Sequence, residues 1–224
     1  MCCRYTLKDI QAVVALCAQL GVGIDLDEED LAPRYNAALT QAMPVVTRRG
    51  GRVRLEKMSF GLTSPARTPA ERPTLLANAR AETLLAKPAF RDAAQHRRCL
   101  VPADGFYEWE KAGAARLPHY FYLQEHRPFF FAGLWQPETE AAPAAFAVVT
   151  TTPNALLRPI HDRMPVVLGP NSGPAWLGDQ PLDPARVAQL CRPLPASMMA
   201  SHRVDPRMNR TAYEAPDCIA SLPG

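Results

Sequence analysis

The second half of the chain consists of short runs of β-forming residues separated by turn signals, and this pattern limits the fold more than any other feature. Runs of this length and spacing are typical of a curved antiparallel sheet or a barrel-like β-structure. The 23 prolines, roughly twice the average usage, divide the chain into many short elements. The runs begin after Arg98 and are Cys99–Trp109, Tyr120–Leu123, Phe129–Trp135, Ala145–Thr151 and Met164–Leu168.

Helices and a hairpin are expected around these runs. Apolar residues at helical spacing predict a helix that Thr6 caps, that continues to about Leu20 and that stops at Gly21. Gly50 and Gly51 predict the turn of a β-hairpin. The remaining segments are expected to be irregular over 34–44, helical over 81–97 with a break at Pro88, helical over 172–177 and 184–191, and extended over 202–204.

The sequence therefore predicts an α+β fold, with one domain over residues 1–224 and a curved antiparallel, barrel-like β-sheet flanked by helices. A chain of 224 residues with 47% hydrophobic content is long enough for one sizeable core. The net charge of +3 permits a local anion-binding cleft without requiring one.

Composition also limits the compartment and the cofactors. No run of 18 apolar residues occurs, so no membrane span is expected. The six scattered cysteines fit reduced thiols in a cytoplasmic protein, which we expect to be a monomer. Cys2 and Cys3 are adjacent and no Cys-x-x-Cys follows, so no metal site is expected.

The start of the chain, Met1-Cys2-Cys3-Arg4, offers a specific chemistry. Removal of Met1 would give Cys2 a free α-amine beside its thiol. The amine can form a Schiff base with an aldehyde, and the tethered thiol can then close a five-membered thiazolidine on the imine carbon. A cysteine at position 2 is weak evidence by itself, so the rest of the chain has to support this chemistry.

Three further stretches carry candidate site residues. Asn78 and Arg80 can present an amide and a guanidinium to one ligand, or Asn78 can be a helix N-cap. Glu108 lies between two aromatic residues; it either faces water or is buried, and burial would raise its pKa toward the range of acid–base catalysis. His161 precedes an apolar strand and either shuttles protons near neutral pH or is structural, with Asp162 available to orient it.

Together these stretches resemble the SRAP (SOS response-associated peptidase) family, whose members process abasic sites in DNA. The resemblance follows the order of the chain to near its end, at Asn209 and Pro216. Its motifs are Met1-Cys2-x-Arg4-Tyr5, Arg34-Tyr35-Asn36, Asn78-Ala79-Arg80-Ala81-Glu82-Thr83, Ala103-Asp104-Gly105-Phe106-Tyr107-Glu108-Trp109 and His161-Asp162-Arg163-Met164-Pro165.

The resemblance implies a concave site for single-stranded DNA that carries an abasic sugar. It implies that Cys2, freed of Met1, crosslinks the ring-opened aldehyde as a stable thiazolidine that shields the lesion. AP-lyase and autoproteolytic activity belong to the same expectation. No metal or organic cofactor is expected, and the resemblance implies a protein associated with the nucleoid in the cytoplasm of a bacterium. The implied catalytic residues are Cys2, Asn78, Glu108 and His161, and the implied phosphate-binding residues are Arg4, Arg80 and Arg163.

The chain departs from the family pattern in two places. Cys3 stands where the family usually has glycine, so its side chain can crowd the sugar or offer a competing thiol. The segment Phe60–Pro65 lacks the tryptophans that the family would stack on DNA bases. Two other functions stay open on the sequence: an amino-terminal-nucleophile cysteine peptidase, and a non-catalytic module that binds single-stranded DNA.

Overall fold

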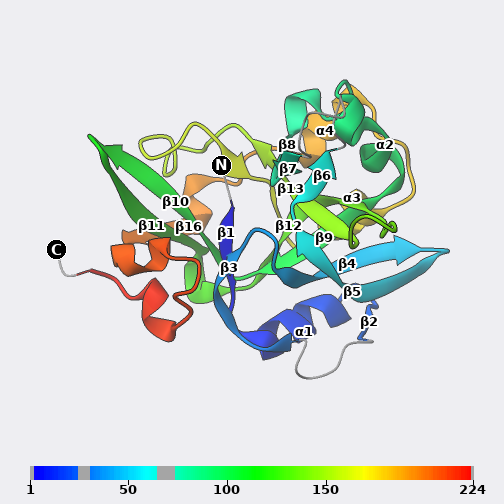
Figure 1. The fold of residues 1–224 in the computed structure, drawn as a ribbon. Helices are drawn as coiled ribbons and strands as arrows, with labels where there is room; N and C mark the ends of the chain where they lie inside the picture. Colours follow the sequence, from blue (N-terminus) through cyan, green and yellow to red (C-terminus); the bar gives the residue numbers. More distant parts are fainter. Residues whose placement is uncertain (1–2, 25–30, 65–73, 223–224) are drawn as a thin grey trace.

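The computed structural model describes residues 3–24, 31–64 and 74–222. Within these residues the strands form two large sheets and one small hairpin (Figure 1). The five-stranded sheet has the order β16 (Met199–Arg203), β11 (Ala115–Leu123), β10 (Gly105–Ala112), β1 (Arg4–Leu7) and β3 (Arg34–Ala38). Its pairings are all antiparallel.

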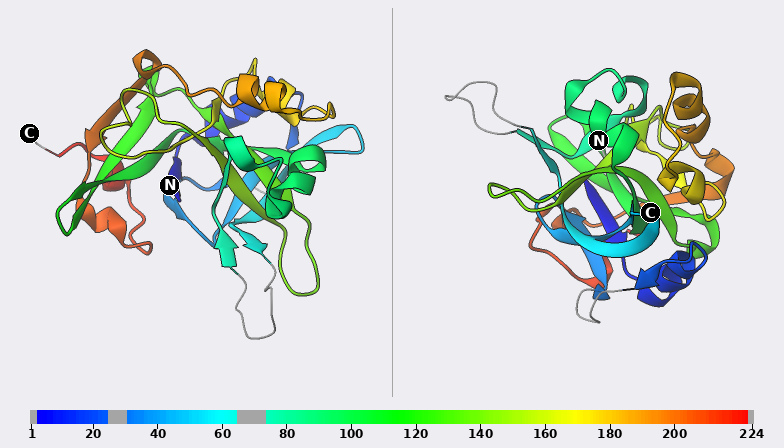
Figure 2. Two further views of the ribbon diagram at one scale, coloured as in Figure 1. Left: turned by 90° about the horizontal axis from the view of Figure 1, so that it is seen from above. Right: turned by 90° about the vertical axis from the view of Figure 1, so that its right-hand side faces the viewer.

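The second sheet has nine strands among the described residues, and it curls on itself (Figure 2). The strands in its main path are β14 (Met164–Pro165), β13 (Ala145–Thr151), β12 (Phe129–Gln136), β9 (Arg98–Ala103), β4 (Ala42–Arg49), β5 (Arg52–Phe60) and β2 (Gly23–Ile24). Outside that path, β15 (Val167–Leu168) pairs with β12, and β8 (Asn78–Arg80) pairs with β13. The strands β6 (Leu62–Ser64) and β7 (Thr74–Leu76) form the hairpin.

Helices lie around this framework, with α2, α3 and α4 gathered beside the nine-stranded sheet and α1 below it in Figure 1. The α-helices are α1 (Ile10–Ala18), α2 (Pro88–His96), α3 (Gly173–Leu177) and α4 (Pro184–Leu190). Short 3₁₀ helices are η2 (Ala81–Thr83), η3 (Gln124–His126), η4 (Ala196–Met198), η5 (Pro206–Asn209) and η6 (Pro216–Ile219). The predicted α+β fold with a curved β-structure is confirmed, although β13 pairs in parallel with β5 and β8.

Aromatic side chains fill the space between the two sheets. Tyr5 of β1 contacts Phe60 and Phe131 edge-on, with ring centroids 5.7 and 5.8 Å apart. Phe60 stacks on Phe146 at 5.0 Å. All four rings are buried. Such edge-on and stacked pairs add to the apolar burial and fix the angle between the sheets, so the start of the chain is held against the core.

The hairpin prediction is confirmed. β4 and β5 pair up to Arg49 and Arg52, with Gly50 and Gly51 between them. These glycines have φ angles of 55° and 78°. A two-residue turn with positive φ at both positions matches the twist of the flanking strands, and glycine adopts it without steric strain.

The predicted start of the first helix is wrong. Thr6 lies in β1, and the N-cap of α1 is Asp9, whose side chain accepts from the Ala12 amide at 3.0 Å. The Thr6 hydroxyl instead donates to Asp104, which also accepts the backbone amides of Lys8 and Asp9 at 2.7 and 2.9 Å. Asp104 thereby fixes the turn between β1 and α1, and it separates β9 from β10 where the sequence predicts one run.

Two other segments differ from the prediction. The segment 34–44, expected to be irregular, contains β3 and the start of β4, because β1 supplies the hydrogen-bonding partners of β3. Pro88 begins α2 instead of interrupting a longer helix, which suits proline since the first helical position needs no backbone N–H. The acidic stretch Asp25–Asp30 lies outside the described residues.

A buried arginine joins two helices to the nine-stranded sheet. The Arg98 guanidinium donates to the carbonyls of Ala94 and Gln95 in the last turn of α2, at 2.7 and 3.0 Å. It also donates to Trp176 in α3 at 2.6 Å, and to Gly178 and Gln180 beyond it. Because carbonyls at helix ends lack partners in the helix and carry partial negative charge, they compensate this buried cation.

Candidate active site

Glu108 is buried in the middle of β10, with 1% of its side chain exposed. Alternation along the strand places it on the same face as Phe106, whose ring packs in the core against Phe121 and Phe131. Burial raises the pKa of Glu108 from its ordinary 4.5 to about 7, because an ionised carboxylate is poorly solvated there. The buried alternative for Glu108 is therefore the correct one, and both protonation states are populated near neutral pH.

His161 lies beside this carboxyl group, at the end of the loop that follows β13. Its Nε2 is 4.0 Å from Glu108 Oε2. Its Nδ1 accepts a hydrogen bond of 3.0 Å from the Arg163 backbone N–H, and the carboxylate of Asp162 also lies 3.0 Å from Nδ1. Burial lowers the pKa of His161, and this outweighs the charge of Asp162. The ring is thus neutral at pH 7, and the Arg163 N–H favours the tautomer with its proton on Nε2.

The distance between these two side chains matches the span of one bridging oxygen atom. A distance of 4.0 Å is too long for a direct hydrogen bond. An oxygen atom placed about 2.8 Å from each of Nε2 and Oε2 would bond to both groups at ordinary distances. The pair can therefore hold one substrate oxygen between a carboxyl group that gives or takes a proton and an imidazole that donates from Nε2.

The first described residue of the chain lies within the electrostatic influence of Glu108. Cys3 is half-buried, and burial followed by the charge of Glu108 raises the pKa of its thiol. A raised pKa keeps this thiol protonated at neutral pH and so weakens it as a nucleophile. Cys2 lies outside the described residues.

Asn78 and Arg80 stand on β8, paired in parallel with Val148 and Thr150 of β13. They flank the buried Ala79, so their side chains leave the opposite face of the strand. Arg80 is exposed, whereas Asn78 is half-buried. The alternative of a helix N-cap at Asn78 is wrong, because this segment is extended and the 3₁₀ helix η2 starts three residues later.

The Arg4 guanidinium holds a segment from near the end of the chain. It is buried, and it donates to Asn36 Oδ1 at 2.6 Å, to the Met208 carbonyl at 3.1 Å and to the Asn209 carbonyl at 2.9 Å. Asn209 in turn accepts a hydrogen bond of 2.7 Å from the Trp109 indole. These contacts clamp the first strand, and the predicted phosphate contact of Arg4 stays a prediction.

The Arg163 guanidinium is also engaged by the protein. It donates to both carboxylate oxygens of Glu82 at 2.9 Å each and to the Thr150 carbonyl at 2.7 Å. Glu82 belongs to the motif Asn78-Ala79-Arg80-Ala81-Glu82-Thr83, in which no role was predicted for it. Its partner lies 81 residues away, and no local pattern identifies such a pair.

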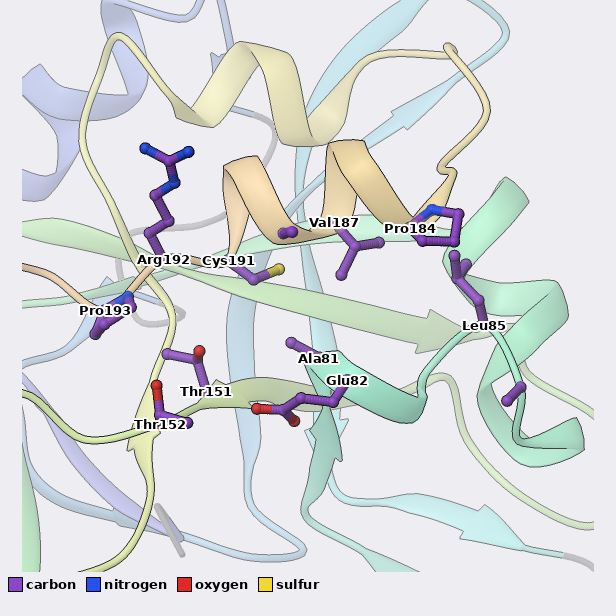
Figure 3. Close-up of a pocket in the computed structure, with 12 residues that line it drawn as sticks. Ala81, Glu82, Leu85, Thr151, Thr152, Pro184, Val187, Cys191, Arg192 and Pro193 are labelled. Carbon is purple, nitrogen blue, oxygen red and sulfur yellow. The ribbon is translucent and has the colours of Figure 1, made fainter.

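Glu82 also borders a cavity of about 440 Å³ between η2 and α4 (Figure 3). The walls are mainly apolar, and the Glu82 carboxylate lies near the side chains of Thr151 and Thr152, while Arg192 points away. A substitution of Glu82 therefore alters a side chain that borders open space and not one that is packed in the core. The cavity is lined by Ala81, Glu82, Leu85, Ala86, Thr151, Thr152, Pro184, Val187, Ala188, Cys191, Arg192 and Pro193.

Within the described residues, no group of three or more metal-ligating side chains occurs. No helix in this part of the chain is long and apolar enough to cross a bilayer.

Comparison with known proteins identifies the family. The model of the SOS response associated peptidase (SRAP) family matches residues 1–211. The chain belongs to the SRAP family. It is 33% identical to the abasic site processing protein YoqW of Bacillus subtilis, over 99% of this chain and 100% of the relative. It is 31% identical to the abasic site processing protein YedK of Escherichia coli, over 79% of each chain.

The same fold is also seen in solved structures. A crystal structure of a protein from Bacteroides thetaiotaomicron superposes with a TM-score of 0.77 at 23% identity, covering 94% of this chain and 96% of that one. A phage-related protein from Bordetella bronchiseptica gives a TM-score of 0.71 at 25% identity over the whole of both chains. The architecture described above therefore also occurs in these two solved structures.

Proposed function

We propose that this SRAP protein processes abasic sites in single-stranded DNA by forming a covalent adduct through Cys2. The observation that carries the proposal is the buried carboxyl group of Glu108, 4.0 Å from His161 and close enough to Cys3 to influence its thiol. Cys2 directly precedes Cys3 in the chain. Membership of the family and the names of the relatives support the lesion as substrate.

The first step is opening of the sugar. An abasic sugar is mostly a closed hemiacetal, and its aldehyde appears when the hydroxyl proton is removed and the ring oxygen is protonated. Glu108, with a pKa of about 7, can take one proton and deliver another near neutral pH. The Nε2–H of His161 would hold the oxygen during this transfer.

Adduct formation then needs both functions of Cys2. With Met1 removed, the amine attacks the aldehyde carbon, water leaves, and an imine forms. The thiol adds to the imine carbon, and its proton passes to the nitrogen, which closes the thiazolidine. Asn78 would orient the amine or sugar, and Arg80 would contact a phosphate. Removal by Glu108 of the proton next to the imine would give β-elimination, the lyase activity expected of the family.

The test uses an oligonucleotide with one abasic site and denaturing electrophoresis. Wild-type protein should give a heat-stable adduct, and intact-mass measurement should show that Met1 is absent. Cys2→Ala keeps the amine but lacks the thiol, so its adduct should appear only after borohydride reduction, while non-covalent binding persists. Glu108→Ala and His161→Ala should each slow the adduct by roughly 10²-fold.

Cys3→Ala is the matched control, because it removes the neighbouring thiol and leaves the aminothiol of Cys2 unchanged. It should crosslink like the wild type. A heat-stable adduct of wild-type yield in Cys2→Ala would refute the mechanism. Cleavage of unrelated peptides without any DNA adduct would instead favour the peptidase function.

A further inference from the structure

Arg163 contacts the candidate site through its backbone and a distant carboxylate through its side chain. Its N–H donates to His161 Nδ1 at 3.0 Å. Its guanidinium makes a two-point ion pair with Glu82 and a third bond to the Thr150 carbonyl. Only 11% of the Arg163 side chain is exposed. Anchoring the side chain at three points also restricts the backbone that carries the N–H.

That N–H competes with a second group for the same ring nitrogen. Asp162 Oδ1 also lies 3.0 Å from His161 Nδ1. A donor at Nδ1 requires the proton on Nε2, whereas an acceptor at Nδ1 requires the proton on Nδ1 itself. The Asp162 side chain is 84% exposed, so water competes for it. The hydrogen bond from the Arg163 N–H to Nδ1 therefore forms in preference to one with Asp162, as long as the Arg163 backbone keeps its position.

We propose that Glu82 is a positioning residue for His161: by anchoring Arg163 it keeps the imidazole proton on Nε2, toward Glu108. The consequence for catalysis rests on the function proposed above, whereas the effect on the ring does not. The ion pair between Glu82 and Arg163 also joins two sequence motifs, the one containing Asn78 and Glu82 and the one containing His161 and Arg163. It gives Arg163 a role other than the expected phosphate contact.

The ionisation of Glu82 is consistent with this role. Burial would raise the pKa of Glu82, but the hydrogen bonds and charge of Arg163 outweigh it and hold the pKa below its usual range. The carboxylate therefore stays charged at neutral pH. A DNA phosphate that used the same face of the Arg163 guanidinium would have to displace this carboxylate. Arg80, two residues before Glu82, is exposed and requires no such displacement.

The first experiment measures directly which nitrogen of the His161 ring carries the proton. NMR of histidine labelled with ¹⁵N distinguishes a protonated from an unprotonated ring nitrogen, and it needs no DNA. In wild-type protein His161 should show the proton on Nε2. Glu82→Gln keeps the shape but removes the charge, and it should shift the ring toward a mixture of tautomers. Glu56→Gln, which removes a carboxylate paired with Arg49 at 3.2 Å, is the matched control and should leave the ring unchanged.

The second measurement separates positioning from phosphate binding. Glu82→Gln should slow adduct formation about tenfold or more, the scale for loss of a group that orients a functional histidine. It should also change the pH profile of the rate, because Glu108, Asp162 and Lys111 then act on a differently protonated ring. The salt dependence of non-covalent DNA binding should stay the same.

Arg163→Lys keeps the charge but loses the two-point geometry, and it should reproduce the tautomer shift of Glu82→Gln. The double variant should be no worse than either single variant, since both changes break one connection. An unchanged tautomer in both folded variants would overturn the proposal. A salt slope flatter by about 0.7 in Arg163→Ala, which removes the charge, with the ring unchanged, would restore the phosphate role. If the tautomer shifts but wild-type protein forms no adduct, the proposed function fails while the positioning role stands.

Discussion

Replacing Glu108 with glutamine should stabilise the protein at high pH and have little such effect at low pH. The side chains have nearly the same shape, and glutamine stands in for the protonated carboxyl group. What the substitution removes is the ability to ionise in a buried position. The free energy of unfolding of the variant relative to the wild type should therefore depend on pH.

The size of the effect follows from the two pKa values. A folded pKa of about 7 against an ordinary 4.5, at about 1.4 kcal/mol for each pH unit, makes ionised Glu108 unfavourable by about 3 kcal/mol. Between these values the folded protein binds more protons than the unfolded chain, so wild-type stability falls as pH rises. The variant lacks this decline, and its advantage should grow by about 3 kcal/mol between pH 4 and pH 8.

Denaturant unfolding of both proteins at pH 4, 6 and 8 measures this difference. Glu110→Gln is the matched control, since it removes a carboxylate from a more exposed position two residues along the same strand. Any general effect of lowering the negative charge of β10 will appear in both variants. A Glu108→Gln difference that is constant with pH, or that favours the wild type at pH 8, would show that the carboxyl group is not held in an apolar site.

Three other changes test separate features. Arg80→Ala should flatten the log–log salt slope of single-stranded DNA binding by about 0.7, as measured by fluorescence anisotropy, and an unchanged slope would exclude a phosphate contact. Cys3→Gly should keep or raise the rate of adduct formation, because the pKa of the Cys3 thiol is raised by burial and by Glu108; loss of the adduct in a folded variant would mean that Cys3 takes part. Arg98→Met should destabilise the protein by about 3 kcal/mol in denaturant unfolding, since several buried carbonyls lose their donor and each one left unsatisfied costs about 1–3 kcal/mol; a loss under about 1 kcal/mol would contradict the compensation described for this arginine.

Features that depend on neighbouring residues could be predicted from the sequence. The hairpin at Gly50 and Gly51 has a local turn signal, and strand periodicity located most of the later strands. The burial of Glu108 was one of two alternatives, because alternation shows which residues share a face but not which face is covered. The core on that face of β10, which includes Phe106, contains residues of both sheets.

Features that depend on distant residues could not be predicted. The strand β3 has no local signal, since its pairing partner is β1. Asn78 looked like a helix cap because asparagine favours that position, but pairing with β13 makes its segment a strand. The ion pair between Glu82 and Arg163 spans 81 residues. In each case a tertiary contact overrides or adds to the local preference.

The clamp on Arg4 has a consequence for the order in which the protein matures. The carbonyl of Met208 that Arg4 binds lies 204 residues later in the chain. During synthesis, β1 therefore emerges long before the partners that bury its arginine. In a chain that stops before Met208, we expect the Arg4 guanidinium to lack the carbonyl acceptors of Met208 and Asn209. We therefore expect the amino-terminal segment to take its final position only after Asn209 has been synthesised.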